Sequence, residues 1–397
     1  MSCKLNDVCE LIVDCPHSTE RDEGEGYPII RTPNIGAGYL DLEGVQRVSK
    51  AAYDRRNIRA VPRANDLILA REAPAGNVGI VREGMEVCLG QRTVLIRPNA
   101  EKVSPLFLNY YLNAPKQRHA LLSNSNGATV SHVNMPIIRN LPVDLPSRET
   151  QGRIADVLSA YDELIENNRR QIKLLEEAAQ RLYKEWFIDL NFPGHETTPI
   201  HNGLPEGWGR SSLGSLTVLI TRGVTPAYIG ESDYVVLGQR CVRNHLVDVD
   251  FARSFEPKPG LKKWIQRNDV LINSTGVGSL GRVAQVWFEP SGMTVDSHVT
   301  IVRAKTEDLS FYLGQWAVFN ETYIESLHTG STGQTELPRD RVAAIELMEP
   351  SGSVLAAFSK VVNPMTAKIV QLQKTIASAR EARDRLLPKL MSREIEA

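Results

Sequence analysis

The stretches of this chain that come nearest to catalytic motifs each lack a residue that the chemistry needs. Residues 276–283 (GVGSLGRV) have the glycine spacing of a phosphate-binding loop, but an Arg-Val pair stands where Lys and Ser or Thr must contact phosphate and Mg²⁺. Asp248, Asp250 and Glu256 follow one another as in some metal-dependent nucleases, yet only one half of the chain carries them, outside any readable strand. The adenine methyltransferase signature, Asp or Asn before Pro-Pro and then Tyr or Phe, is absent. The sequence therefore predicts a chain that is not an enzyme by itself.

Cysteine and histidine side chains near the N-terminus raise the question of a metal site. Cys3, Cys9 and Cys15 are each six residues apart, and His17 follows. This spacing differs from the Cys-x2-Cys of zinc sites, so we favour small apolar side chains over zinc ligands and expect no metal. Five cysteines, an odd number in a long chain, indicate reduced thiols.

Two polar, glycine-containing stretches offer a different chemistry, the reading of base edges. They are SNSNGATVSH at residues 123–132 and HTGSTGQTEL at residues 328–337. Ser, Thr, Asn, Gln and His present both donors and acceptors, as the edges of base pairs in the major groove do. Ordinary surface turns have the same composition, and both interpretations stay open. The recurrence of the loop in the two halves of the chain is what favours DNA.

One sequence pattern occurs twice. NDLILAREAPAGNVGIV at residues 65–81 returns as NDVLINSTGVGSLGRV at residues 268–283, each with a Gly-x-x-Gly step. Gly76 would then match Gly278, 202 residues later. An internal repeat predicts a pseudo-twofold axis, and such a chain suits a target with two half-sites.

Candidate DNA-binding residues lie in the two polar loops and beside the glycine turns. In the first half they are Arg71, Asn77, Gln91, Arg92, Asn124, Asn126, Thr129, Ser131 and His132; in the second half they are Asn273, Ser274, Ser297, His298, Thr329, Ser331, Thr332 and Gln334. No base-by-base code connects these side chains to nucleotides, so the sequence does not predict the target.

A globular unit of short strands and one main helix opens each half. Apolar runs between Gly, Pro and Asn predict strands at residues 27–31, 66–70, 78–81 and 93–97, and again at 235–237, 270–272, 282–287 and 299–302. A helix is expected after each set of strands, at residues 104–113 and 308–319. Strands followed by a helix predict two α+β domains.

A long heptad helix follows each globular unit. Seam residues alternate at spacings of four and three, which is typical of a coiled coil. They include Ile154, Leu158, Ile165, Asn168, Ile172, Leu175, Leu182 and Trp186 in the first helix and Phe358, Met365, Ile369, Leu372, Ile376 and Leu386 in the second. Two such helices in one chain most simply pack on each other, and the domain between them is long enough to permit an antiparallel pair.

Three residues modify this prediction. Asn168 at a seam position can fix the register of the helices at a cost in stability. Pro364 would break a continuous helix, so we expect the second helix to restart there, and we expect Pro388 to end it.

The first seam is about 48 Å long at ~1.5 Å per residue, so the helices could act as a ruler that sets the distance between the two domains. A dimerisation or bundle helix with no metric role is the alternative.

Composition and charge limit the class of protein. The 397 residues are 42% hydrophobic, and no apolar run approaches the ~18 residues that span a bilayer. The N-terminus has no features of a signal peptide, so we expect a cytoplasmic protein without membrane contact. A formal net charge of −1 argues against a protein that simply coats duplex DNA, although local base-reading loops remain compatible with it.

Several further segments carry a family resemblance. They are LPEGW (204–208) running into SLGSLTVLITRGVTP (212–226), the pairs Asn65-Asp66 and Asn268-Asp269, SHVNMP (131–136), GSTGQT (330–335) and AREARDRLLPKL (379–390). In this order the chain resembles the DNA-specificity subunit of type I restriction-modification systems over essentially its full length. The first half lacks the Leu-Pro-x-Gly-Trp lead-in and opens directly at Leu5, which leaves the docking of the N-terminal segment open.

The resemblance implies an α+β fold in which two similar target-recognition domains are separated by two long antiparallel coiled-coil helices with an internal pseudo-twofold. The domains would be residues 1–146 and 191–350, and the spacer helices residues 147–190 and 351–397. It further implies a non-catalytic subunit that binds a bipartite, asymmetric sequence in double-stranded DNA.

The partners implied by the resemblance are two methyltransferase subunits and restriction or translocase subunits. They would supply S-adenosylmethionine, N6-adenine methylation, ATP and Mg²⁺, while this chain would hold no cofactor. Two other classes stay open: a coiled-coil scaffold, and a stand-alone site-specific nuclease or methyltransferase, which the missing motifs disfavour.

Overall fold

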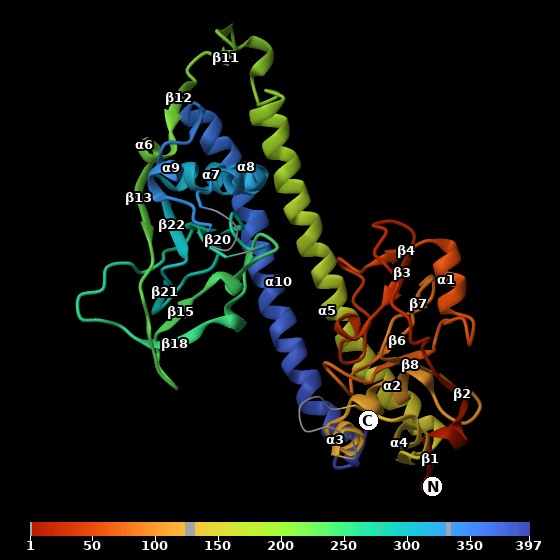
Figure 1. Cartoon of the computed structure of the whole chain (residues 1–397). Coiled ribbons are helices and arrows are strands. Elements are labelled where there is room, and N and C mark those ends of the chain that lie inside the picture. Colours follow the sequence, from red (N-terminus) through yellow and green to blue (C-terminus); the bar gives the residue numbers. More distant parts are fainter. Residues whose placement is uncertain (1, 124–131, 277, 331–334) are drawn as a thin grey trace. The chain divides into compact units, whose positions relative to one another are not determined.

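The computed structural model describes residues 2–123, 132–276, 278–330 and 335–397. The chain divides into two compact units (Figure 1). Unit 1 comprises residues 1–166 together with residues 376–397, and unit 2 comprises residues 167–375. Unit 1 is therefore built from both ends of the chain, whereas unit 2 is one continuous segment.

Unit 1 is centred on a four-stranded antiparallel sheet in the order β2-β8-β5-β6. Its strands are β2 (Cys9–Asp14), β8 (Thr93–Pro98), β5 (Leu67–Ala70) and β6 (Val78–Ile80). A second sheet has the order β4-β3-β7, from β4 (Arg47–Val48), β3 (Tyr27–Ile30) and β7 (Cys88–Leu89), and β1 (Ser2–Lys4) pairs with β9 (Pro142–Asp144). The helices of this part are α1 (Lys50–Arg56), α2 (Pro105–Asn113), α3 (Pro115–Ser123) and α4 (Met135–Arg139).

Unit 2 repeats this plan with the sheet order β13-β22-β19-β20. The strands are β13 (Thr217–Arg222), β22 (Val299–Ala304), β19 (Val270–Asn273) and β20 (Val283–Gln285). The second sheet has the order β14-β18-β15-β21, from β14 (Ala227–Tyr228), β18 (Arg253–Glu256), β15 (Val235–Leu237) and β21 (Met293–Val295). Shorter pairs are β10 (Ile200–His201) with β11 (Leu204–Pro205), β12 (Gly209–Ser212) with β23 (Glu346–Glu349), and β16 (Val242–Arg243) with β17 (Leu246–Val247). Its short helices are α6 (Leu213–Leu216), α7 (Glu307–Phe319), α8 (Glu321–Ser326) and α9 (Arg339–Ala343).

Strands and helices lie close to where the sequence predicts them, because their local signals agree with their burial. Every residue of β5 and β19 is buried, which is why both read as short apolar runs between turn residues. The main helices begin after Ser104 and Thr306, whose hydroxyls accept hydrogen bonds from the backbone N–H three residues later. The α+β prediction with a duplicated globular unit is thereby confirmed.

The duplication extends to irregular features. Strands β2 and β13 both carry a register shift, between Cys9 and Leu11 in one and between Thr217 and Leu219 in the other. β-Bulges are designed features rather than random defects, so the shared position indicates two copies of one unit.

The predicted match between Gly76 and Gly278 is wrong. The Gly76 N–H donates to the Ala70 carbonyl, and the corresponding bond in unit 2 runs from Gly281 to Asn273, both at 2.8 Å. Gly76 and Gly281 both have positive φ, +91° and +84°. The β19–β20 hairpin thus contains two more residues than the β5–β6 hairpin, and a surface loop tolerates such an insertion.

Two long helices follow the globular parts. Helix α5 (Arg148–Tyr183) continues into a π-helical turn, Lys184–Ile188, and α10 spans Gly352–Ser392. The predicted break at Pro364 and the predicted end at Pro388 are wrong, because α10 runs through both prolines. Pro364 is exposed, so the backbone carbonyl left without a helical partner by the missing N–H can be solvated.

Most predicted seam residues are buried where the two helices meet within each unit. In unit 1, Leu390 of α10 packs in one core with Ile154 and Leu158 of α5, and Arg383 Nη1 donates to Asp162 Oδ1 at 2.6 Å. The early part of α5 therefore contacts the late part of α10, which makes the pair antiparallel. Leu175, Leu182, Met365, Ile376 and Leu386 are only partly buried.

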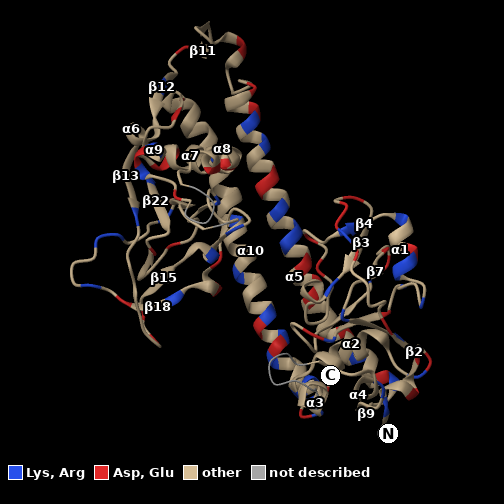
Figure 2. Ribbon diagram, in the orientation of Figure 1, with Lys and Arg blue, Asp and Glu red and all other residues tan. Residues whose placement is uncertain are grey.

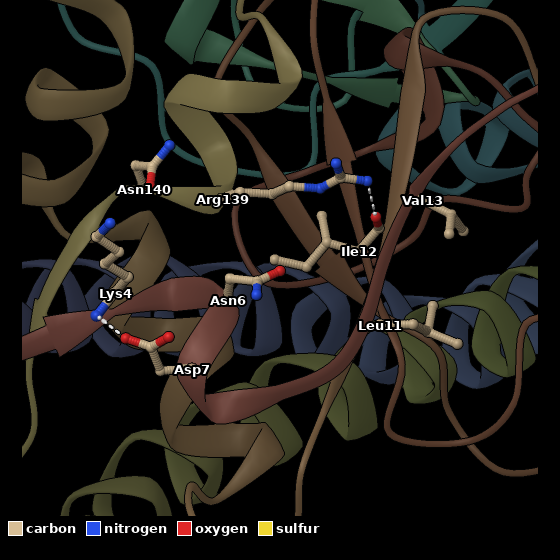
Figure 3. Close-up of a pocket in the computed structure, with 8 residues that line it drawn as sticks. All are labelled: Lys4, Asn6, Asp7, Leu11, Ile12, Val13, Arg139 and Asn140. Carbon is tan, nitrogen blue, oxygen red and sulfur yellow. Dashed lines mark hydrogen bonds between the residues drawn. The ribbon is translucent and has the colours of Figure 1, made fainter.

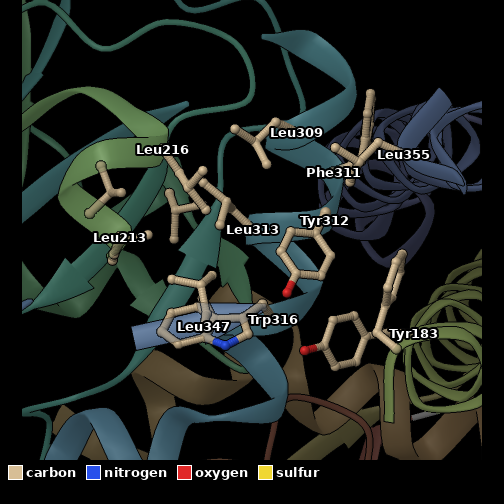
Figure 4. Packing of buried hydrophobic residues seen from close by; sticks show 14 of the residues in the cluster. Tyr183, Leu213, Leu216, Leu309, Phe311, Tyr312, Leu313, Trp316, Leu347 and Leu355 are labelled. Carbon is tan, nitrogen blue, oxygen red and sulfur yellow. The ribbon is translucent and has the colours of Figure 1, made fainter. Parts of the chain in front are cut away.

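In unit 2 the end of α5 joins the core of the globular part. Tyr183 lies against Tyr312 of α7 with ring centroids 5.9 Å apart (Figure 4). Trp186 packs on Phe358 of α10 with ring centroids 5.7 Å apart. Leu355 of α10 belongs to the same cluster. Within the described residues, no helix is long and apolar enough to cross a membrane.

Candidate nucleic-acid interface

Four of the predicted DNA-binding residues of unit 1 line one pocket of about 240 Å³. Arg71 follows β5, Gln91 and Arg92 form the turn between β7 and β8, and His132 precedes α4. The pocket also contains His17 and Glu72, which the sequence analysis did not select. We call Arg71, Glu72, Gln91, Arg92 and His132 the unit 1 cluster.

The unit 1 cluster is a chain of charged contacts. Arg92 Nε lies 2.7 Å from Glu72 Oε2, and the other oxygen of Glu72 contacts His132 Nδ1. His132 Nε2 lies 2.8 Å from Arg71 Nη2. These contacts fit a neutral imidazole with its proton on Nδ1, because that nitrogen then donates to the carboxylate and Nε2 accepts from the guanidinium.

Arg71 supports this cluster from below the surface. It is only 6% exposed, and its Nε donates to the Val133 carbonyl at 2.8 Å. Burial lowers the pKa of Arg71, while the thiol of Cys15 and the carboxylate of Glu72 act in the opposite direction. A buried guanidinium that holds the backbone beyond the polar loop positions other groups rather than reaching a base itself.

The remaining candidates of unit 1 lie elsewhere. The Asn77 side chain donates from Nδ2 to the Ile35 carbonyl at 2.9 Å and so fixes a neighbouring loop. Asn124, Asn126, Thr129 and Ser131 lie outside the described residues.

In unit 2 the predicted residues divide into buried supports and accessible groups. Asn273 and Ser274 are fully buried; Asn273 Nδ2 donates to the Gln239 carbonyl at 3.1 Å, and Ser274 Oγ lies 2.6 Å from Thr300 Oγ1. Ser297 is partly buried and His298 is exposed. Thr329, also partly buried, pairs with Glu336 through the backbone, whereas Ser331, Thr332 and Gln334 lie outside the described residues.

Uncharged polar side chains lie beside His298. Its Nδ1 lies 2.8 Å from Thr275 Oγ1, and Gln239 Nε2 lies 2.9 Å from the same hydroxyl. The backbone N–H of His298 donates to Asp296 Oδ1 at 2.9 Å. We call Gln239, Thr275 and His298 the unit 2 cluster. Gln239 and Thr275 were missed by sequence reasoning, although Thr275 lies directly beside the selected Ser274.

The two clusters occupy equivalent places in the repeat. Arg71 N donates to the Arg92 carbonyl at 2.8 Å, and Ser274 N donates to the His298 carbonyl at 2.8 Å. The next residues along, Glu72 and Thr275, then provide the side chains that contact Arg92 and His298. One backbone arrangement therefore presents a carboxylate–guanidinium pair in unit 1 and a hydroxyl–imidazole pair in unit 2.

The backbone after each polar loop is held by an arginine, but from a different strand. In unit 1 this is Arg71, after β5. In unit 2 it is Arg222 at the end of β13, whose Nη2 donates to the Leu337 carbonyl at 2.9 Å and pairs with Glu336 Oε1 at 2.9 Å. The same support is thus retained while the polar groups around it differ.

Three arginine side chains of unit 2 stack on aromatic rings. The guanidinium carbons of Arg240 and Arg243 lie 4.7 and 5.2 Å from the ring centre of Phe251, and that of Arg253 lies 3.5 Å from Tyr228. Elsewhere basic and acidic residues are interspersed, as Figure 2 shows along α5 and α10. This distribution agrees with a formal net charge of −1.

A second pocket in unit 1 contains none of the predicted residues. It is lined by Lys4, Asn6, Asp7, Leu11, Ile12, Val13, Arg139 and Asn140 (Figure 3). Arg139 Nη2 donates to the Ile12 carbonyl at 2.9 Å, and the Asp7 carboxylate accepts from the backbone N–H of Lys4. Its polar groups thus largely serve the local fold.

Metal ligands do not assemble in the part of the chain that the structure describes. There, no three His, Cys, Asp or Glu side chains come together as a metal site would require. All five cysteines are free thiols.

Known proteins resemble this chain in sequence and in fold. Residues 1–177 match the family model of the Type I restriction modification DNA specificity domain. The Type I restriction enzyme MjaIX specificity subunit of Methanocaldococcus jannaschii is 26% identical over 99% of this chain and 92% of its own length. The HindI specificity subunit of Haemophilus influenzae is 21% identical over 76% of this chain and 80% of its own length.

A solved structure shares the fold. The S subunit of the type I restriction-modification system from M. genitalium aligns with a TM-score of 0.57 at 15% identity, covering 98% of this chain and 95% of that one. Residues 1–177 belong to the type I restriction-modification DNA specificity family, and the similarity to the MjaIX subunit extends over 99% of the chain. The proteins that it resembles over most of its length are named specificity subunits of type I restriction enzymes.

Proposed function

We propose that this chain binds a bipartite, asymmetric sequence in double-stranded DNA, with one half-site read by each unit. Supporting this is the equivalence of the two clusters: one backbone frame carries Glu72 and Arg92 in unit 1 but Thr275 and His298 in unit 2. Groups that differ in charge and in donor pattern select different base edges. The two half-sites are therefore expected to differ in sequence.

The accessible groups of each cluster make the base contacts in this proposal. They are Gln91, Arg92 and His132 in unit 1 and Gln239, Thr275 and His298 in unit 2, together with the polar loops at 123–132 and 328–337. The buried residues Arg71, Asn273 and Ser274 hold the frame. We assign the globular recognition domains to residues 1–146 and 191–350, and the spacer helices to residues 147–190 and 351–397.

Catalysis is supplied by other subunits in this proposal. Two methyltransferase subunits would bind S-adenosylmethionine and methylate N6 of adenine, and restriction or translocase subunits would use ATP and Mg²⁺. The M. jannaschii relative is called a restriction enzyme specificity subunit, which supports a complex of this kind. The chain itself would hold no cofactor and would act in the cytoplasm.

Exchange of one domain tests the proposal. Residues 1–146 are replaced by the matching domain of a relative, and methylated positions are mapped by sequencing DNA from cells with the complete system. We expect one half-site to change while the other stays the same. The control replaces residues 191–350 and should change only the other half-site. A change in both half-sites, or methylation without sequence preference, contradicts the proposal.

A further inference from the structure

The exposed end of the unit 1 cluster is a guanidinium held by a carboxylate. Arg92 Nε faces Glu72 Oε2 at 2.7 Å, and the Arg92 side chain is 56% exposed while that of Glu72 is 18% exposed. Among the described residues, no hydrogen bond engages Nη1 or Nη2 of Arg92. Arg92 also has a positive φ of 64°, in the tight turn that precedes β8. The two terminal nitrogens of Arg92 are therefore available at the surface, while the contact at Nε restrains the side chain.

Glu72 is itself held in place. Its second oxygen contacts His132 Nδ1, and His132 in turn contacts the buried Arg71 at 2.8 Å. His132 directly, and Arg71 through His132, thus hold the carboxylate that orients Arg92. Side chains fixed in this way recognise a partner more selectively, because they lose little freedom on binding.

The carboxylate of Glu72 determines whether the Glu72–Arg92 pair can bind a phosphate or a base edge. A phosphate close to Arg92 would meet the negative charge of Glu72, and this repulsion disfavours a backbone contact. Base edges carry no net charge. Guanine offers the O6 and N7 acceptors that an arginine fork engages, and the paired cytosine offers an N4 donor that a carboxylate accepts.

We propose that Arg92 recognises the guanine of a G·C base pair in the half-site of unit 1, and that Glu72 is the positioning residue for Arg92. This inference rests on the proposed function and goes beyond it by naming a base pair and the side chain that reads it. The unit 2 cluster lacks both charges, so the assignment applies to unit 1 alone.

The test is selection of bound sequences from a randomised duplex library by the full chain together with its methyltransferase partner. Wild type is compared with Arg92→Gln, Arg92→Lys and Glu72→Gln, and with His298→Asn as the matched control in unit 2. Domain exchange identifies which selected half-site belongs to unit 1. Melting curves and retention of the unit 2 half-site show that each variant is folded.

We expect Arg92→Gln to reduce the preference for one G·C pair by about 5- to 150-fold and to leave every other position unchanged. Arg92→Lys should also lose preference there, because lysine keeps the charge but not the fork. Glu72→Gln should weaken the preference at the same base pair. His298→Asn should alter only the other half-site.

Other outcomes overturn the inference in distinguishable ways. If Arg92→Gln weakens binding to all duplexes equally and lowers the salt dependence by about one phosphate contact, while Arg92→Lys binds normally, Arg92 is a backbone contact. The inference is also refuted if the half-site selected by unit 1 contains no G·C pair whose preference depends on Arg92. If wild type selects no sequence at all, it is the proposed function that fails.

Discussion

At the scale of single residues, the strongest sign of duplication is a buried ion pair that occurs twice. Asp66 accepts two hydrogen bonds from Arg97, at 2.9 and 2.7 Å, and Asp269 accepts two from Arg303, both at 2.8 Å. Each arginine also donates to a backbone carbonyl, and each aspartate accepts a backbone N–H three residues before it. The aspartate oxygens are thereby satisfied although the side chains are buried, as buried charges require.

Replacing Asp66 by Asn should destabilise unit 1. The change leaves the Arg97 guanidinium buried without its charge partner, and loss of one partner of a buried pair costs about 3–5 kcal/mol. Hydrogen exchange should accelerate in β5 and β8 and stay unchanged in β19 and β22. Asp269→Asn should give the reverse pattern.

The control is Glu149→Gln, in an exposed pair with Arg153, which should lower the free energy of unfolding by no more than about 0.5 kcal/mol. Unchanged exchange in β5 and β8 of the Asp66→Asn protein would contradict this account.

Thiol reactivity should follow burial. Desolvation raises the pKa of Cys88 to about 12 and that of Cys241 to about 11. Because the thiolate is the reactive form, both should label slowly with iodoacetamide at pH 8 and faster as the pH rises toward those values. The partly exposed Cys3 serves as the internal comparison, and labelling in urea should remove the difference. Native labelling of Cys88 as fast as Cys3 would show that the site is open.

At the scale of elements, sequence reasoning was most successful where one local signal suffices. Strand β5 was predicted from an apolar run between turn residues, and helix α2 was expected at residues 104–113 after the strands; in the structure Ser104 caps that helix and Pro105 begins it. The prolines of α10 were misread because packing along the seam outweighs the hydrogen bond that each proline removes.

The candidate site could be predicted only in part. Arg71, Gln91, Arg92 and His132 were selected by residue type, and they do meet in one pocket. Glu72 was missed because its role depends on contacts with residues 20 and 60 positions away. Asn273 and Ser274 were selected, but they are buried, and burial is set by packing that no local pattern reports.

Glu176 of α5 should make the stability of the helix pair depend on pH. Desolvation raises the pKa of its carboxyl group to about 7, and Oε1 has no hydrogen-bond partner among the described residues. Between about pH 4.5 and 7 the folded chain then binds more protons than the unfolded chain, so stability falls as the pH rises through this range.

Glu176→Gln should remove this dependence and raise the unfolding temperature at pH 8 relative to wild type. Glu177→Gln, at the exposed neighbouring position, removes only the smaller cause of the raised pKa of Glu176 and should shift the pH profile slightly without abolishing it. Melting curves from pH 4.5 to 8 measure both. Equal pH profiles for wild type and Glu176→Gln would rule out a buried carboxylate.

At the scale of the whole molecule, the proposed function implies that the paired helices set the distance between the two half-sites. Seven residues added to α5 between Ile165 and Leu175, with seven added to α10 between Leu372 and Ala379, lengthen the pair by about 10 Å and preserve the heptad pattern. At about 3.4 Å per base pair, the gap between half-sites should grow by about three base pairs. Methylation mapping reports the gap directly, and an unchanged gap would leave the helices as a bundle without a metric role.

The composition of unit 1 from both chain ends has a consequence for synthesis. Leu390 is 2% exposed in the core that contains Ile154 and Leu158, and Arg153 donates to the Ala397 carbonyl. On the ribosome, residues 1–166 emerge first but wait for residues 376–397, a delay of roughly 10–40 s at about 5–20 residues per second. Unit 2, being continuous, can finish folding during that interval. The half of the protein that is translated first is therefore the half completed last, and the face of α5 that Leu390 covers stays exposed until then.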